Sequence, residues 1–254
     1  MIGTPCRTTL FCDFDGPIVD VSARYYATYL QALEQLKVVL SSNQRYPCHQ
    51  EIHYNTLTKE QFWALKRYRI PDFEIAIRSG IPGDYIDDFL SIVRSLVNQP
   101  SLLHYDCLQP GIRWALELMN SQGVRLILVT LRCQSQVEDI LRAYRLGHLF
   151  KAVWGTQYED VAYLNSADCK TALLEKAWDN TCRFHGTPQC SWMIGDTEAD
   201  ILAGQARKIG TVALTCGIRS RSYLSQYRPD HICTDLVSVT HSLVNPAKSA
   251  SLMR

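Results

Sequence analysis

The chain has 254 residues, of which 46% are hydrophobic and 20% charged, so it is long enough to bury a full core and to carry a second, smaller module. Its 26 basic and 25 acidic residues leave a formal net charge of +1. A nearly neutral chain has no general attraction for phosphate backbones or anionic lipids, so we expect no nucleic-acid partner and no membrane partner.

The N-terminus and the cysteines indicate where the protein works. The sequence MIGTPCRTTLFCDF lacks the basic segment and long apolar segment of a secretory signal, and no run of about 18 apolar residues predicts a membrane span. The ten cysteines are scattered and include no CxxC pair for a zinc site or a redox dithiol. We expect most of them to be small buried apolar side chains, and we expect a cytoplasmic protein.

The first predicted element is a strand over Thr8–Cys12, a short apolar run that ends in an acidic turn. From about Val19 to Pro100 no convincing strand follows. Segments such as SARYYATYLQALEQL, KEQFWALKRY and DYIDDFLSIVRSLV instead have helical periodicity. The sequence therefore predicts a helical insertion directly after the first strand, joined by short linkers that allow opening and closing.

After the insertion, short apolar runs alternate with amphipathic segments, as in parallel strands joined by helices. The run VRLILVT over 124–130 is the strongest strand candidate because it is apolar on both faces. Further strands are predicted over 151–154, 191–194 and 211–215, and helices from 112 and over 134–144, 168–178 and 198–208. The predicted fold is α/β: a doubly wound, Rossmann-like parallel-sheet core over 1–18 and 101–254, with an inserted α-helical domain over 19–100.

The stretch LFCDFDG places Asp13 and Asp15 at the end of the first predicted strand. A hairpin turn does not fit, because the following segment is not an alternating strand. An EF-hand does not fit either, because it needs Gly and Glu where the chain has Ile18 and Arg24. Ligands of open α/β sheets bind beyond the carboxyl ends of the strands, where two carboxylates need a cation. Mg²⁺ would remove their repulsion and attract a phosphate oxygen.

Other strand ends carry side chains that would complete such a site. Thr130 ends the strongest strand, with Arg132 close behind, and a hydroxyl there can bind a phosphate oxygen. Asp196 follows a later strand in GDTEAD, and Asp200 lies where the next helix begins. Lys170 opens a helix at an edge of the sheet, where an ammonium group can neutralise both a nucleophile and a substrate. Together these residues suit a metal ion and a phosphate group.

Four motifs in this order resemble the haloacid dehalogenase superfamily of phosphohydrolases, namely DFDG, the strand ending in Thr130, Lys170 and GDTEAD. The resemblance covers nearly the whole chain, and the segments PGIRWALELMNSQGVRLILVT and GTVALTCGIRS are similar to its phosphoglycolate-phosphatase-like branch. The helical insertion has the position of a type 1 cap in that superfamily. The resemblance implies a Mg²⁺-dependent phosphatase that hydrolyses a small phosphorylated metabolite through an aspartyl-phosphate intermediate.

The resemblance also implies a role for each site residue. Asp13 would attack phosphorus, and Asp15 would protonate the leaving group and then take a proton from water. Thr130 and Lys170 would bind the transferring phosphoryl oxygens. The implied Mg²⁺ ligands are the carboxylate of Asp13, the backbone carbonyl of Asp15 and the carboxylate of Asp196, with Asp200 acting through water or Lys170.

The helical insertion would decide substrate specificity, since a lid that closes over the leaving group reads its shape. Arg24 and Arg67 in the insertion, and Arg132 at the sheet edge, are the candidate substrate-binding residues. For the basic residues around Arg67, a solvated helix face is an equally good interpretation. The sequence does not specify an oligomeric state.

Two departures from the family pattern bear on the site. Pro17 stands where most relatives have Thr, Val or Tyr and removes a backbone donor from the turn, while Leu131 stands where many have Asn. Asp15 argues against cleavage of carbon–halogen bonds, which needs no acid for the leaving group. A sugar phosphomutase on the same fold, or a non-catalytic phosphate-binding or interaction protein, remains an alternative.

Overall fold

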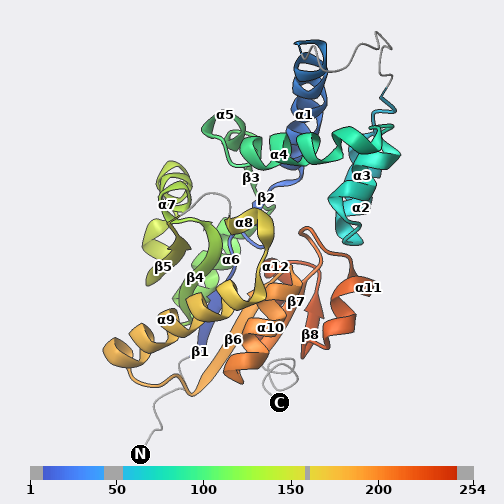
Figure 1. The fold of residues 1–254 in the computed structure, drawn as a ribbon. Helices are drawn as coiled ribbons and strands as arrows, with labels where there is room; N and C mark the ends of the chain where they lie inside the picture. Colours follow the sequence, from blue (N-terminus) through green and yellow to red (C-terminus); the bar gives the residue numbers. More distant parts are fainter. Residues whose placement is uncertain (1–7, 43–53, 158–160, 245–254) are drawn as a thin grey trace, which may run out of the picture. The chain divides into compact units, whose positions relative to one another are not determined.

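The computed structural model describes residues 8–42, 54–157 and 161–244 (Figure 1). The chain forms two compact units, one containing the residues up to Asp20 and from Leu108 onward, the other Val21–Cys107. We call them the sheet unit and the helical unit. The division falls a few residues later in the chain than the boundaries predicted after residues 18 and 100.

The sheet unit is built on a six-stranded sheet in the order β5-β4-β1-β6-β7-β8, in which all the neighbouring strands are parallel (Figure 1). Its strands are β1 Thr8–Cys12, β4 Arg125–Cys133, β5 Ala152–Thr156, β6 Cys190–Gly195, β7 Gly210–Leu214 and β8 His231–Cys233. From β1 the chain moves first to β4 and β5, then to β6 and beyond. This reversal makes the sheet doubly wound, and ligands of such sheets bind beyond the carboxyl ends of the strands at the reversal, here that of β1.

Helices cover both faces of this sheet, which explains why β1 is buried along its whole length. Helices α9 (Ala167–His185) and α10 (Glu198–Arg207) pack together on one face, and α6 (Ile112–Ser121) and α12 (Leu236–Val244) pack together on the other (Figure 1). The remaining elements of this unit are α7 Gln134–Ala143, α8 Val161–Leu164, α11 Arg221–Leu224 and the 3-10 turns η2 Gly147–Leu149 and η3 Ser225–Tyr227.

The predicted fold class is confirmed, and all five predicted strands are present. The main differences are at element ends and edges. Strand β4 continues past Thr130 to Cys133, and α9 continues past Trp178 to His185. The edge strand β8, with the sequence HIC, was not predicted because a strand this short has no readable periodicity.

The helical unit contains α1 Ser22–Ser42, α2 Lys59–Arg67, α3 Asp72–Arg78, η1 Gly83–Tyr85, α4 Ile86–Leu96 and α5 Pro100–Leu103. Its core combines aliphatic side chains with a group of aromatic rings. The ring of Tyr29 stacks on Phe62 with centroids 5.0 Å apart and meets the edge of Phe89 at 6.4 Å. Two short strands, β2 (Val19–Asp20) and β3 (Cys107–Leu108), form a separate two-stranded sheet.

Arg24 has a structural position in the helical unit, which revises the expectation that it binds substrate. Its side chain is fully buried. Its Nε donates to Asp106 Oδ1 at 2.9 Å, and its Nη1 donates to the Val97 carbonyl at 2.8 Å and to Asn98 Oδ1 at 2.7 Å. The guanidinium therefore ties the start of α1 to the segments that follow α4 and α5.

No helix in the described ranges is both long and apolar enough to cross a membrane. The cysteines of these ranges form no disulfide with one another. The cytoplasmic location stays a prediction.

We expect Arg24→Met to destabilise the protein by about 3–5 kcal/mol, because it leaves the Asp106 carboxylate buried without its guanidinium. The matched control is Arg78→Met, which removes an exposed i,i+4 pair with Glu74 and should change stability by less than about 0.5 kcal/mol. Urea unfolding of both variants measures the difference. Equal losses from the two substitutions would contradict the structural role of Arg24.

Candidate active site

Asp13 is the first residue after β1, and its carboxylate is held from several sides. Its backbone N–H donates to the Ile194 carbonyl of β6 at 2.8 Å, which fixes the chain at the switch point of the sheet. Its Oδ1 accepts from the Phe14 N–H at 2.7 Å and lies 2.8 Å from Lys170 Nζ. The side chain is buried, so its orientation is set before any ligand binds.

The turn after Asp13 accommodates Pro17 without losing backbone hydrogen bonds. The Phe14 carbonyl accepts from the N–H groups of Ile18 at 3.0 Å and Val19 at 3.2 Å, and Gly16 N–H donates to the Val19 carbonyl at 2.8 Å. These hydrogen bonds use N–H groups other than the one that Pro17 lacks.

Lys170 joins two carboxylates of the site. It lies in the first turn of α9, and its Nζ is 2.8 Å from both Asp13 Oδ1 and Asp200 Oδ1. Burial lowers the pKa of Lys170, but the charges of Asp13 and Asp200 outweigh it and the pKa lies above its ordinary value. The side chain is therefore a permanent ammonium group.

Asp196 and Asp200 approach from the end of β6 and the start of α10. Asp196 Oδ2 accepts from the Ile218 N–H at 2.6 Å, whereas its buried Oδ1 has no hydrogen-bond partner among the described residues. Asp200 Oδ2 accepts from the N–H and the hydroxyl of Thr197 at 3.1 and 2.7 Å, in a capping box that starts α10.

Two glycines make room for the Asp196 carboxylate. A Cβ built on Gly16 or on Gly217 would overlap its carboxyl atoms. Gly16 also has φ +95°, a conformation that side chains disfavour. The glycine of the DFDG motif is therefore needed for both conformation and space.

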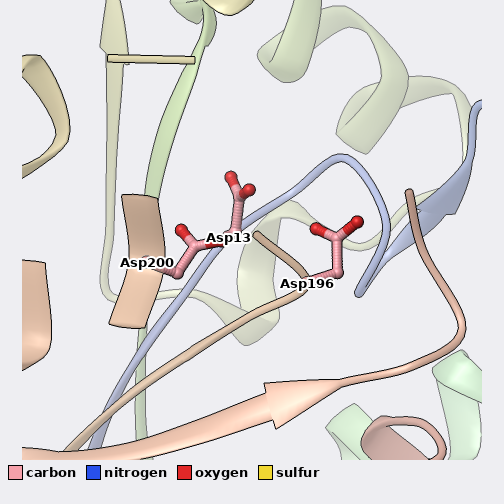
Figure 2. A group of neighbouring side chains, drawn as sticks. All are labelled: Asp13, Asp196 and Asp200. Carbon is pink, nitrogen blue, oxygen red and sulfur yellow. The ribbon is translucent and has the colours of Figure 1, made fainter. Parts of the chain in front are cut away.

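Carboxylate oxygens of Asp13, Asp196 and Asp200 lie within 4.8 Å of one another, and Figure 2 shows the three side chains converging from separate parts of the chain. Burial raises the pKa of Asp13 to about 7 despite Lys170, and burial and the neighbouring Asp13 and Asp200 raise the pKa of Asp196. With one ammonium, three ionised carboxylates leave two negative charges. This donor set and the unbonded Asp196 Oδ1 fit a hard divalent cation.

Thr130, Asp15 and Arg132 form a second group in the sheet unit. Thr130 Oγ1 accepts from the Arg132 N–H at 3.2 Å, so its own hydrogen is available to donate elsewhere. Arg132 Nη1 donates to Asp15 Oδ1 at 2.9 Å. The Asp15 carboxylate is thus directed at Arg132 and is not part of the three-carboxylate group, and its predicted metal contact through the backbone carbonyl stays a prediction.

The structure thus brings together the predicted residues of the sheet unit in two neighbouring groups. Arg24 and Arg67 belong to the helical unit, where Arg67 lies partly buried on α2. Sequence reasoning missed the loop after β7, which supplies the Ile218 N–H and Gly217. Arg219 of this loop binds Glu198 Oε2 at 2.9 Å. The signal that could have revealed the loop is its place after the strand predicted over 211–215, because ligands bind beyond the carboxyl ends of such strands.

The chain is similar to known proteins over most of its length. The family described as haloacid dehalogenase-like hydrolase matches residues 10–214. A probable phosphoglycolate phosphatase of Pseudomonas putida is 24% identical over 180 residues, which cover 70% of this chain and 68% of the relative. The pyrophosphatase PpaX of Anoxybacillus flavithermus is 24% identical over 238 residues, which cover 91% and 95%. The chain spans about half the length of some other curated relatives.

A solved structure has the same fold. A haloacid dehalogenase-like family hydrolase from Streptococcus pneumoniae superposes with a TM-score of 0.62 at 21% identity, covering 94% of this chain and 99% of that one. The family resemblance of the sequence motifs is therefore confirmed. The chain belongs to the haloacid dehalogenase-like hydrolases, in the branch that contains phosphoglycolate phosphatases and pyrophosphatases.

Proposed function

We propose that this protein is a Mg²⁺-dependent phosphatase that hydrolyses a small phosphorylated metabolite through an aspartyl-phosphate intermediate. The observation that carries the proposal is the Asp13 carboxylate, buried beside the Lys170 ammonium and next to two further aspartates. This combination pairs a nucleophile with positive charge at the point where a phosphoryl group would sit. The phosphatase names of the relatives support it.

The carboxylates of Asp13 and Asp196 would hold the metal directly, together with the backbone carbonyl of Asp15. Asp200 would act through Lys170, which it contacts, and through water. When bound, Mg²⁺ would neutralise the carboxylates and polarise the phosphoryl oxygens.

In the first step Asp13 attacks phosphorus. Its Oδ1 accepts from the Phe14 N–H and lies 2.8 Å from Lys170 Nζ, which orients the carboxylate for the attack. As the new bond to phosphorus forms, the bond from phosphorus to the leaving oxygen breaks, and Asp15 gives that oxygen a proton. Lys170 and the Thr130 hydroxyl would bind phosphoryl oxygens and stabilise their charge in the transition state.

In the second step Asp15 works as a base. Its carboxylate takes a proton from a water molecule while the water oxygen bonds to phosphorus, and the bond between phosphorus and Asp13 breaks. Inorganic phosphate leaves and both aspartates return to their starting protonation states.

The helical unit is proposed to be the cap that selects the substrate, with Arg67 as its remaining substrate-binding candidate. Phosphoglycolate and pyrophosphate are the first compounds to test, because relatives carry those names. The protein is proposed to act in the cytoplasm.

Asp13→Asn should lower the rate of phosphate release by at least about 10³-fold, because an amide is not a nucleophile of comparable strength. Phosphate release from a panel of phosphorylated metabolites, phosphoglycolate and pyrophosphate with Mg²⁺ measures it. The control Asp139→Asn removes an exposed carboxylate paired with Arg142 and should leave the rate unchanged.

Two results would overturn the phosphatase assignment. One is that the wild type releases no phosphate from any compound of the panel. The other is a stable isomer of a sugar phosphate formed without phosphate release, which would indicate a phosphomutase.

Metal-free protein should lose stability as the pH rises. The pKa of Asp13 is about 7 when folded and near 3.8 when unfolded, so between these values the folded state binds more protons. The free energy of unfolding should therefore be lower at pH 8 than at pH 5, by roughly 2–3 kcal/mol. Mg²⁺ favours the ionised carboxylates and should restore stability at pH 8.

Urea unfolding at both pH values, with EDTA or with Mg²⁺, measures this effect without any assay of activity. Asp13→Asn lacks the titrating group and should show a smaller drop between pH 5 and pH 8. If Mg²⁺ adds no stability to the wild type at pH 8, the carboxylate cluster is not its binding site.

A further inference from the structure

The ion pair between Arg132 and Asp15 is a feature that the proposed mechanism does not use. Arg132 lies on β4, two residues after Thr130, and its side chain is only 1% exposed. Its Nη1 is 2.9 Å from Asp15 Oδ1, whose side chain is 21% exposed. The guanidinium thus reaches from the buried strand to the most open carboxylate of the site.

The surroundings of Arg132 fix the direction of this contact. Its backbone N–H donates to Thr130 Oγ1 at 3.2 Å, its Nε donates to Gln136 Oε1 at 3.4 Å, and its guanidinium carbon lies 5.8 Å from the centre of the Phe14 ring. The guanidinium is planar and buried, and it donates through Nε and Nη1, which limits its rotation. It can therefore hold the partner carboxylate in one orientation.

We propose that Arg132 is a positioning residue for the acid–base Asp15, and not a ligand of the substrate phosphate. The inference rests on the proposed function. It replaces the expectation that Arg132 binds substrate directly. Instead of binding substrate, the guanidinium holds Oδ1 of Asp15 so that the carboxyl group faces the leaving oxygen.

The proton balance of the reaction agrees with this role. A guanidinium has only donors and keeps its protons, so the Asp15 oxygen that it binds does not carry the transferred proton. That proton is carried by Oδ2, passes to the leaving oxygen as its bond to phosphorus breaks, and is replaced from water in the second step. Arg132 itself gains and loses no proton.

Two kinds of leaving group distinguish a role of Arg132 in positioning Asp15 from a role in binding the substrate phosphate. An alkyl alkoxide needs a proton as it departs, whereas p-nitrophenolate is a stable anion that leaves without one. The quantity to compare is kcat/KM, because it reports the steps up to departure of the leaving group and not the later hydrolysis of the aspartyl phosphate. If Arg132 instead bound the substrate phosphate, its replacement would lower kcat/KM equally for both kinds of substrate.

We expect Arg132→Met to lower kcat/KM about 10²-fold for β-glycerol phosphate, or for the alkyl monoester that the wild type hydrolyses fastest. The loss for p-nitrophenyl phosphate should be at least ten times smaller. Arg132→Lys should recover part of the alkyl activity. In an Asp15→Asn background, Arg132→Met should cause no further loss, because Arg132 acts through Asp15.

The matched control is Arg125→Met, which removes another arginine of β4, one that donates to Thr9 Oγ1 at 3.4 Å. Arg125→Met should lower kcat/KM for neither substrate. Its thermal unfolding provides a reference for the fold of the Arg132 variants. Equal losses on the two substrates, or a further loss in the Asp15→Asn background, would overturn the positioning role. A wild type that releases no phosphate from these two substrates or from any other compound of the panel would remove the proposed function and this inference together.

Discussion

The contact of one ammonium group with two carboxylates holds the site together. Lys170 Nζ lies 2.8 Å from Asp13 and from Asp200, and without this charge three buried carboxylates would repel one another. Lys170 reaches this place because α9 packs on the sheet through Leu174 and Trp178, in the same core cluster as Phe11 of β1. Hydrophobic packing thereby positions the charge on which the proposed chemistry depends.

The orientation of the three carboxylates depends largely on hydrogen bonds from the backbone. Amide groups of Phe14 and Ile218 bind the carboxylates of Asp13 and Asp196, and the capping box of α10 binds Asp200 through Thr197. Formation of the sheet and of α10 therefore assembles the carboxylates as well. The orientation is established by folding and needs little reorganisation when a phosphate binds.

The sequence predicted the fold class and the residues at the strand ends, because apolar periodicity and motif order are local signals. It could not predict the partners of long charged side chains. Arg24 binds Asp106 and Arg132 binds Asp15, across 82 and 117 residues of sequence. Such pairs depend on how the elements pack, so the sequence alone predicts substrate contacts for both arginines and not these ion pairs. The short edge strand β8 was missed because it has no pattern to read.

The space around Asp196 also limits how the sequence of this protein can change. Gly16 and Gly217 contribute no functional group, yet any side chain at either position would collide with a carboxylate that the proposed metal needs. A random library would therefore tolerate fewer substitutions at these two glycines than at many residues with reactive side chains. The space at these two glycines is therefore as much a requirement of the site as the carboxylates themselves.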